Sequence, residues 1–339
     1  MIALAQFGAG RIGQIHARNV ASTEGARLKY VIDVNEAAAQ SLAAAVGARM
    51  SDCDAALADP EVAAVIIGSS TDTHAELIEA SARAGKAIFC EKPIDLDLQR
   101  TRACLEVVRE TGVPLFIGFN RRFDPSFAGL KAALAEGRIG RLENLTITSR
   151  DPAPPPADYV ARSGGLFRDM MIHDFDMARW LLGAEPVRLY ARGSVLVDPA
   201  IGKAGDIDSA VVVLETAAGV LCQIINSRRA AYGYDQRIEA FGEHGLLLAG
   251  NRDARSLETW SDAGIAGEKP LHFFLERYAE AYRAEMAHFL ACLAGKEEPK
   301  VAAADGLRAL ELAEAANLSL KTGQAVNFKA ERDLAPSAP

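Results

Sequence analysis

The sequence predicts an α/β protein with two domains: an N-terminal doubly wound parallel sheet, then a C-terminal α+β domain with an open, mainly antiparallel sheet. Up to residue 119, short apolar segments alternate with helical patterns, which is the order of a parallel sheet with crossover helices. Beyond residue 141, strand-like segments follow one another with few helices between them, which is typical of antiparallel sheets. We therefore expect domains at 1–119 and 120–329, and a flexible tail at 330–339.

Length, charge and cysteine content narrow the class of protein. The 339 residues are enough for two domains with buried cores. A formal net charge of −8 at pH 7 disfavours nucleic acid or an anionic membrane as the partner. The six histidines and five cysteines show no metal-ligand spacing, so we expect neither a bound metal nor a disulfide framework. The chain shows no apolar run of membrane-spanning length and no signal peptide before its first strand, so we expect a cytoplasmic protein.

The first expected element is a strand at residues 2–7, followed by a glycine-rich turn and a helix. The turn carries Gly8, Gly10 and Gly13 in G-x-G-x-x-G spacing, with Arg11 and Ile12 before the last glycine. Glycines allow the backbone to approach a pyrophosphate closely, and the N-terminus of the following helix attracts its negative charge. Alone, this spacing is equally compatible with a loop of no function.

A second strand, at residues 27–33, strengthens the nucleotide interpretation. It ends in Asp33, at the distance from the glycines where a carboxylate can bind both ribose hydroxyls of an adenosine. Val34 follows it, and not an arginine that could hold a 2′-phosphate. We therefore expect a Rossmann domain that binds NAD in preference to NADP, with Val34 among the contacts.

Strands at 62–68, 87–90 and 114–118 should complete this sheet, with helices at 73–84 and 98–111 between them. Ligands of such sheets bind beyond the carboxyl ends of the strands. The candidate cofactor contacts after the strand at 62–68 are Ser69, Ser70, Thr71 and His74. Capping of the next helix by Asp72 or Thr73 would also explain this polarity.

The second polar strand end is Glu91-Lys92-Pro93. Because Pro93 disfavours helical geometry in the residue before it, Lys92 should extend from the strand end into the crevice. The alternative is an ordinary surface lysine in a loop. Glu91 and Lys92, together with Asn120 after the last strand, complete the predicted cofactor contacts.

Residues 163–182 are expected to form one helix after a break at Gly164 and Gly165. On such a helix Asp169, His173 and Asp176 fall at i, i+4 and i+7, so one face carries two carboxylates and an imidazole. A carboxylate one turn away can hold the imidazole in one tautomer, as a general base near neutral pH requires. A solvated polar face with an ion pair is the alternative.

The remaining segments suggest the second domain. Strands are expected at 142–150, 187–196, 208–215, 220–226, 237–242 and 245–248, with a hairpin loop at 216–219. Helices are expected at 273–292 and 305–320. The proline-rich residues 151–156 form either a plain connector or the wall of a ligand pocket.

Four segments together resemble the Gfo/Idh/MocA family of sugar and polyol oxidoreductases over nearly the whole chain. They are the glycine turn at 8–13, Glu91-Lys92-Pro93, residues 118–124, and residues 164–176. Residues 149–152, 169–179, 233–237 and 273–278 look like the inositol dehydrogenases of that family. The resemblance implies a Rossmann domain, a sheet domain that forms homotetramers through its open face, and a catalytic set of Lys92, Asp169 and His173.

That set suggests a mechanism and a polyol substrate. His173 would remove a hydroxyl proton from a ring alcohol while its carbon gives hydride to NAD; Asp169 would orient the imidazole and Lys92 stabilise the alkoxide. Candidate contacts to substrate hydroxyls are Lys92, Asn120, Arg121, Asp151, Asp169, His173, Asp176 and Tyr234. Oxidation of another inositol isomer (scyllo or chiro) or of an aldose such as glucose remains open. So does a non-catalytic nucleotide-binding sensor, which would be expected to lack Lys92 or His173.

Overall fold

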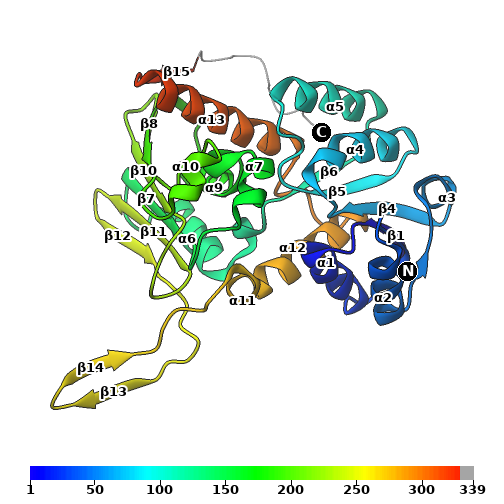
Figure 1. Ribbon diagram of the computed structural model, residues 1–339, viewed down its shortest axis with the longest axis horizontal. Coiled ribbons are helices and arrows are strands. Elements are labelled where there is room, and N and C mark those ends of the chain that lie inside the picture. The colour runs from blue at the N-terminus through cyan, green and yellow to red at the C-terminus, as the bar shows by residue number, and fades with distance from the viewer. Residues whose placement is uncertain (329–339) are drawn as a thin grey trace. The chain divides into compact units, whose positions relative to one another are not determined.

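A computed structural model describes residues 1–328, which form two compact units (Figure 1). The first unit comprises Met1–Pro125 and Tyr278–Glu311, and the second comprises Ser126–Arg277 and residues 312–328. The division expected from the sequence ran at residue 119 and kept 278–311 in the second domain; the contacts return that segment to the first unit. The tail expected at 330–339 lies outside the described residues.

The first unit contains a six-stranded, fully parallel sheet in the order β3-β2-β1-β4-β5-β6. Its strands are β1 (Ile2–Phe7), β2 (Ala26–Ile32), β3 (Arg49–Met50), β4 (Val62–Ile67), β5 (Ala87–Glu91) and β6 (Leu115–Gly118). Its helices include α1 (Arg11–Ala21), α2 (Glu36–Val46), α3 (Cys53–Ala58), α4 (His74–Arg83), α5 (Leu98–Thr111) and α12 (Ala279–Leu293), with 3₁₀ turns η1 (Thr71–Thr73) and η2 (Asn120–Phe123). This strand order is that of a Rossmann domain, as the sequence predicts.

Helix α12 belongs to this unit because it completes the hydrophobic core. Phe289 is 1% exposed, and its ring lies 5.5 Å from that of Phe89 on β5 and 4.8 Å from that of Phe116 on β6. Met286, one turn earlier, is fully buried in the same cluster as Leu4 of β1. Helix α12, although distant in sequence, therefore completes the hydrophobic core on one face of the first sheet.

The second unit contains a seven-stranded sheet in the order β12-β11-β7-β10-β9-β8-β15. Its strands are β7 (Leu142–Arg150), β8 (Pro186–Ser194), β9 (Ser209–Thr216), β10 (Leu221–Ser227), β11 (Asp235–Gly242), β12 (Gly245–Ala249) and β15 (Val326–Asn327). Only the β7–β10 pair is parallel among these described strands. The helices are α6 (Pro125–Ala135), α7 (Ala157–Ser163), α8 (Gly165–Asp169), α9 (Ile172–Leu182), α10 (Pro199–Lys203) and α11 (Phe274–Arg277); α13 (Ala303–Thr322) spans the boundary between units. The expected mainly antiparallel sheet is confirmed.

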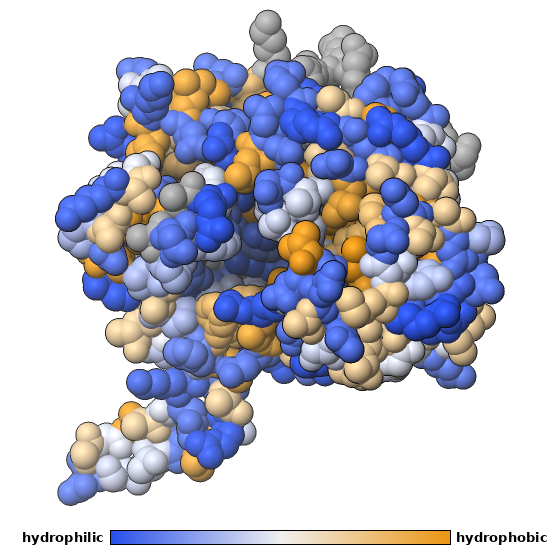
Figure 2. Space-filling model, turned by 45° about the vertical axis from the view of Figure 1, so that its right-hand side comes forward, coloured by the Kyte–Doolittle hydropathy of each residue, from blue (hydrophilic) through white to orange (hydrophobic). Residues whose placement is uncertain are grey.

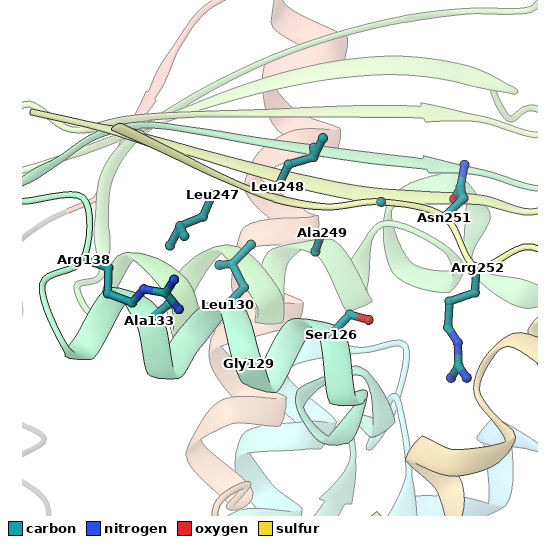
Figure 3. A pocket seen from close by; sticks show the side chains of 11 residues that line it. Ser126, Gly129, Leu130, Ala133, Arg138, Leu247, Leu248, Ala249, Asn251 and Arg252 are labelled. Carbon is teal, nitrogen blue, oxygen red and sulfur yellow. The ribbon is translucent and has the colours of Figure 1, made fainter. Parts of the chain in front are cut away.

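The two faces of this sheet differ in exposure. Val212 and Leu214 on β9 are fully buried, whereas Val213 between them is 37% exposed. Figure 3 shows Leu247 of β12 pointing toward Leu130 of α6, while the neighbouring Leu248 turns to the other side of the sheet. We define the open face as the exposed side, which carries Tyr190, Val211, Val213, Leu221, Phe241, Leu246 and Leu248.

A two-stranded hairpin, β13 (Glu258–Ser261) with β14 (Gly264–Gly267), was not expected from the sequence. It extends away from the second unit's sheet (Figure 1), and Figure 2 shows both hydrophobic and hydrophilic side chains on it. Every residue of both strands is exposed. The apolar and polar alternation that reveals half-buried strands is therefore missing here.

The helix expected at 273–292 is divided into α11 and α12, with Tyr278 between them. Tyr278 is 2% exposed and its backbone leaves the helical region. Among residues 1–328, no helix combines the length and apolar character needed to cross a bilayer.

Candidate active site

In the glycine turn of the first unit, backbone segments pack directly against each other. A Cβ on Gly13 would lie 2.1 Å from the carbonyl oxygen of Gly8, and one on Gly8 would lie 2.4 Å from that of Gly68. Gly8 also has a φ of 102°, which favours glycine. Gln6, fully buried at the end of β1, donates from Nε2 to the carbonyl oxygens of Gly8 and Gly13 at 2.9 and 2.7 Å. The turn is therefore fixed before any ligand binds.

Helix α1 presents its N-terminus at this turn. Gly10 is its N-cap and supplies no side-chain acceptor for the first N–H groups of the helix. A Cβ on Gly10 would meet nothing within 4 Å, which leaves room for a group to approach the backbone. Arg11 and Ile12 form the first turn of this helix. These features fit the pyrophosphate of a dinucleotide.

Asp33 lies just beyond the end of β2, beside the glycine turn. Its Oδ2 accepts a hydrogen bond from the Ala9 N–H at 2.6 Å, and its Oδ1 accepts one from Asn35 N–H at 2.8 Å. Val34 is fully exposed. Each carboxylate oxygen retains a lone pair, so Asp33 is able to accept hydrogen bonds from ribose hydroxyls.

The loop after β4 is closed by its own hydroxyls. Ser69 Oγ and Thr73 Oγ1 lie 2.6 Å apart, and Thr73 Oγ1 donates to the Ser70 carbonyl oxygen at 2.8 Å. The Thr73 side chain makes no capping hydrogen bond to α4, so capping by Thr73 does not explain this polarity. Ser70 remains exposed and Thr71 partly exposed at the strand end.

Two predicted cofactor contacts are buried against the protein itself. Glu91 is 9% exposed and lies 2.6 Å from the imidazole of His16. His74 is 1% exposed and directs both ring nitrogens at backbone carbonyl oxygens. Glu91 Oε1 and both ring nitrogens of His74 are therefore engaged by protein partners. Lys92, between them in the fold, is partly exposed.

Asn120 and Arg121 lie in η2, directly after the sheet. Asn120 is 2% exposed, and its Nδ2 donates to no protein group among residues 1–328. The guanidinium of Arg121 stacks over the Tyr278 ring at 5.6 Å. The amide of Asn120 therefore supplies a buried donor that fits a bound ligand.

In the second unit, the expected single helix at 163–182 is wrong. Helix α8 ends at Asp169, and α9 begins at Ile172. Met170, Met171 and Ile172 are all buried, at 5%, 0% and 0% exposure. At the break, the N–H groups of Met170 and Met171 both donate to the Leu166 carbonyl oxygen, which ends the regular i→i−4 pattern of an α-helix. Asp169 and His173 therefore lie on two helices.

Asp169 is held by partners that the sequence did not reveal. Its Oδ1 accepts from the Tyr159 hydroxyl at 2.9 Å, and its Oδ2 accepts from Arg228 at 2.9 Å. Arg228, only 3% exposed, also donates to Asp151 Oδ2 at 3.4 Å. Burial opposes the charge of Arg228, but Asp169 and Asp151 together raise its pKa, and burial beside Asp169 raises the pKa of Tyr159. The buried guanidinium of Arg228 thus bonds to two of the predicted substrate contacts, Asp151 and Asp169.

A second buried carboxylate fixes helix α9. Asp174 is fully buried, and accepts hydrogen bonds from Ser149 Oγ of β7 at 2.6 Å and from Asn226 Nδ2 of β10 at 2.9 Å. These bonds attach the residue after His173 to the centre of the sheet. An Asp in an apolar stretch is the signal that could have revealed it.

Two further predicted substrate contacts of this unit are buried. Asp176 on α9 is fully buried, and Tyr234 is 6% exposed with its ring 6.3 Å from that of Phe273. Gly233, with a φ of 131°, precedes it. The second unit therefore holds Asp151, Asp169, His173, Asp176 and Tyr234, and the first unit holds Lys92, Asn120 and Arg121.

Asp235 anchors the start of β11, next to Tyr234. Its carboxylate is fully buried and accepts from Arg150 at 2.7 Å, from Arg237 at 2.7 Å and from Asn251 at 2.7 Å. Burial raises the pKa of this carboxyl, but the hydrogen bonds from Arg237, Tyr232 and Asn251 outweigh it and hold the pKa at about 2.

A cavity of about 390 Å³ lies elsewhere in the second unit, between α6 and β12 (Figure 3). It is lined by residues such as Gly129, Leu130, Leu247 and Arg252 and includes none of the predicted site residues. Within residues 1–328, no group of three or more His, Cys, Asp or Glu side chains is arranged to hold a metal ion.

Comparison with known families assigns the class of protein. Residues 2–119 match the oxidoreductase family with an NAD-binding Rossmann fold, and residues 127–248 match the GFO/IDH/MocA C-terminal domain. The chain belongs to the GFO/IDH/MocA family of oxidoreductases, and its first unit is an NAD-binding domain. The family and cofactor expected from the sequence are confirmed.

The relatives narrow the class further. The chain is 54% identical over 311 residues to an inositol 2-dehydrogenase of Rhizobium meliloti, covering 91% of this chain and 94% of that protein. It is 47% identical over 325 residues to a myo-inositol 2-dehydrogenase of Thermotoga maritima, covering 95% and 97%. The crystal structure of scyllo-inositol dehydrogenase from Lactobacillus casei with bound NAD(H) and scyllo-inositol superposes with a TM-score of 0.89 at 29% identity, covering 96% and 99%.

Asp235 should make the stability of the second unit depend on acid pH. Its pKa of about 2 lies below the ordinary Asp value, so the stabilisation is complete above about pH 4 and is lost as the pH falls toward 2. At pH 6 the free energy of unfolding of the Asp235→Asn variant should be about 2 kcal/mol lower than that of the wild type, and this difference should shrink in acid. Urea unfolding at several pH values measures this. Asp158→Asn, at an exposed acid, is the control; a pH-independent gap for Asp235→Asn would contradict the assignment.

Proposed function

We propose that this protein oxidises a ring hydroxyl of myo-inositol to a keto-inositol and transfers the hydride to NAD, as in inositol catabolism. The observation that supports a polyol substrate best is the charge network of Asp151, Arg228 and Asp169, with Tyr159 on its edge. A molecule with a hydroxyl on every ring carbon requires closely spaced donors and acceptors. The relatives named for inositol oxidation support the same substrate class.

In this proposal each catalytic residue has one role. His173 removes the proton from the reacting hydroxyl, and NAD, when bound, accepts the hydride from the same carbon. Asp169 orients and charge-balances the imidazole, while Arg228 and Tyr159 hold Asp169 in place. The ammonium of Lys92 stabilises the alkoxide as it forms. The products are a ketone, NADH and one proton.

The position of His173 depends on the residue that follows it. Asp174 bonds to two strands of the sheet, so α9 has little freedom to turn or slide. A general base must stay within hydrogen-bond reach of the proton that it removes. Asp174 therefore supports catalysis without contacting substrate.

Asp33 favours NAD over NADP in this proposal. Both of its oxygens already accept backbone N–H groups, which keeps the carboxylate directed at the glycine turn. A 2′-phosphate there would meet a like charge at short range, and Val34 offers no compensating cation.

Two other functions remain as alternatives. A relative named scyllo-inositol 2-dehydrogenase (NAD⁺) is 37% identical over 331 residues, so another inositol isomer is the second candidate, and an aldose such as glucose the third. A non-catalytic nucleotide sensor is remote, because Lys92, Asp169 and His173 are all present.

We also propose a cytoplasmic homotetramer. Support for the tetramer comes from the open face, where Val211, Phe241 and Leu248 are 41%, 47% and 63% exposed. Several exposed large apolar side chains on one face of a sheet are typical of a protein interface. All five cysteines are unpaired thiols, which agrees with a reducing compartment. Cell fractionation tests the cytoplasmic location.

Replacing the base should abolish turnover without weakening cofactor binding. We expect His173→Ala to lower kcat roughly 10²- to 10⁴-fold, because the imidazole acts on the substrate proton. The dissociation constant for NADH, measured by fluorescence, should stay nearly unchanged. Near-normal turnover by this variant would return His173 to the simple polar-face interpretation.

A substrate panel tests the polyol assignment. NADH production should be measured with inositol isomers, aldoses and acyclic polyols at fixed NAD concentration. We expect myo-inositol to have the highest kcat/KM, with weaker activity on an isomer or glucose, since isomers superpose most of their hydroxyls. A tenfold preference for another sugar would overturn the substrate but keep the hydride transfer; no activity with any polyol would overturn both.

The oligomer is tested on the open face. Sedimentation velocity should show a tetramer for the intact chain. A Val211→Glu, Val213→Glu double variant should shift it to smaller species, because a buried carboxylate without a partner opposes association. Met50→Glu, at a similarly exposed apolar side chain of the first unit, is the control. A monomeric wild type, or a double variant that stays tetrameric, would contradict the proposal.

A further inference from the structure

The strand end that carries Lys92 is held by two buried histidines from different helices. Lys92 follows β5, with Glu91 before it and Pro93 after it. His16 of α1 contacts the Glu91 side chain, and His74 of α4 contacts the Pro93 carbonyl oxygen. All of these residues lie in the first unit. Both neighbours of Lys92 are therefore fixed.

The contact of His16 with Glu91 is short and largely buried. His16 Nε2 lies 2.6 Å from Glu91 Oε1, and the imidazole is fully buried. Its ring packs edge-on against Phe89 at 4.9 Å and Tyr282 at 5.9 Å. Nδ1 has no hydrogen-bond partner among residues 1–328. We therefore assign the proton to Nε2, which donates it to the carboxylate.

The other side of the Glu91 carboxylate rests against Gly118. A Cβ on Gly118 would lie 3.0 Å from both Glu91 Cδ and Oε2, and 3.1 Å from Oε1. Gly118 does not have a positive φ, so backbone conformation does not require a glycine here. The close approach of the Glu91 side chain explains the glycine instead. The end of β6 thus leaves room for the carboxylate that His16 holds.

His74 joins two strand ends. Its Nδ1 lies 2.8 Å from the Pro93 carbonyl oxygen, and its Nε2 lies 3.2 Å from the Ser69 carbonyl oxygen. Burial lowers the pKa of His74, so the ring is neutral near pH 7 and donates to one carbonyl at a time. The shorter contact is the one to Pro93, next to Lys92.

We propose that His16 and His74 are positioning residues that hold Lys92 in its working geometry and link it to the two loops expected to bind NAD. The link follows from connectivity: α1 begins at the glycine turn, and α4 begins after the Ser69 loop. This inference rests on the proposed function, in which Lys92 stabilises the alkoxide. Misplacing a catalytic group by about 1 Å costs on the order of 100-fold in rate, so the two contacts matter even though neither touches substrate.

The first test is a double-mutant cycle between His74 and Lys92. His74→Leu should lower kcat roughly 10- to 100-fold, and His74→Asn, whose amide donates from nearly the position of Nδ1, should recover most of it. In a Lys92→Met background, His74→Leu should lower the residual kcat by less than about threefold, because its effect acts through the lysine. The dissociation constant for NADH and the Tm are measured in parallel.

The second test perturbs the His16 side without removing a buried partner. Gly118→Ala should push the Glu91 carboxylate and lower kcat, again with little further effect in the Lys92→Met background. His288→Asn is the matched control, since His288 is a buried histidine of the same unit paired with Glu297 at 2.7 Å. It should change the Tm and not kcat.

The outcomes separate the inference from the function. Losses that multiply in the double variants, or folded His74→Leu and Gly118→Ala variants with wild-type kcat, would overturn the positioning role alone. A Lys92→Met variant with wild-type kcat would instead overturn the proposed role of Lys92, and the inference with it. Loss of kcat that His74→Asn restores, and that vanishes without Lys92, supports both.

Discussion

The first unit depends on a contact that leaves no space for a side chain. At Gly8, Gly13 and Gly68, the ends of β1 and β4 meet the start of α1 so closely that any Cβ would lie within van der Waals overlap or contact of backbone. That approach brings the N-terminus of α1 to the carboxyl end of the sheet, where Asp33 bonds to the turn. This geometry suits a dinucleotide, because the backbone N–H groups of the turn and the N-terminus of α1 can approach a pyrophosphate closely.

In the second unit, several carboxylates with little exposure to solvent need partners that stabilise them. Asp169 and Asp151 share the Arg228 cation, whereas Asp174 relies on neutral donors from Ser149 and Asn226. A buried charge without such partners would cost several kcal/mol. The helices that carry the candidate site are therefore attached to the sheet by polar bonds at the points where the chemistry needs accuracy.

Patterns of local sequence predicted most strands, because burial on one or both faces sets the order of apolar residues. The strand at 142–150 and the helix at 98–111 are correct at both ends. Predictions that depended on tertiary contacts were less accurate. The break between α8 and α9 falls at residues 170–172, an apolar stretch with no glycine or proline to mark it. The role of Arg228 becomes visible only when Asp151 and Asp169 lie beside it. The β13–β14 hairpin has no buried face, so it left no periodic pattern.

Helix α12 has a consequence for how the chain is made. β6 ends at Gly118 and α12 begins at Ala279, so strands β7 to β14 leave the ribosome before Phe289 is available to cover Phe89 and Phe116. The Rossmann sheet must wait, with an apolar face uncovered, while most of the second unit is synthesised. Neither unit is therefore encoded by one continuous segment of the gene. A recombination point near residue 125 would separate the nucleotide-binding sheet from the helix that completes its core.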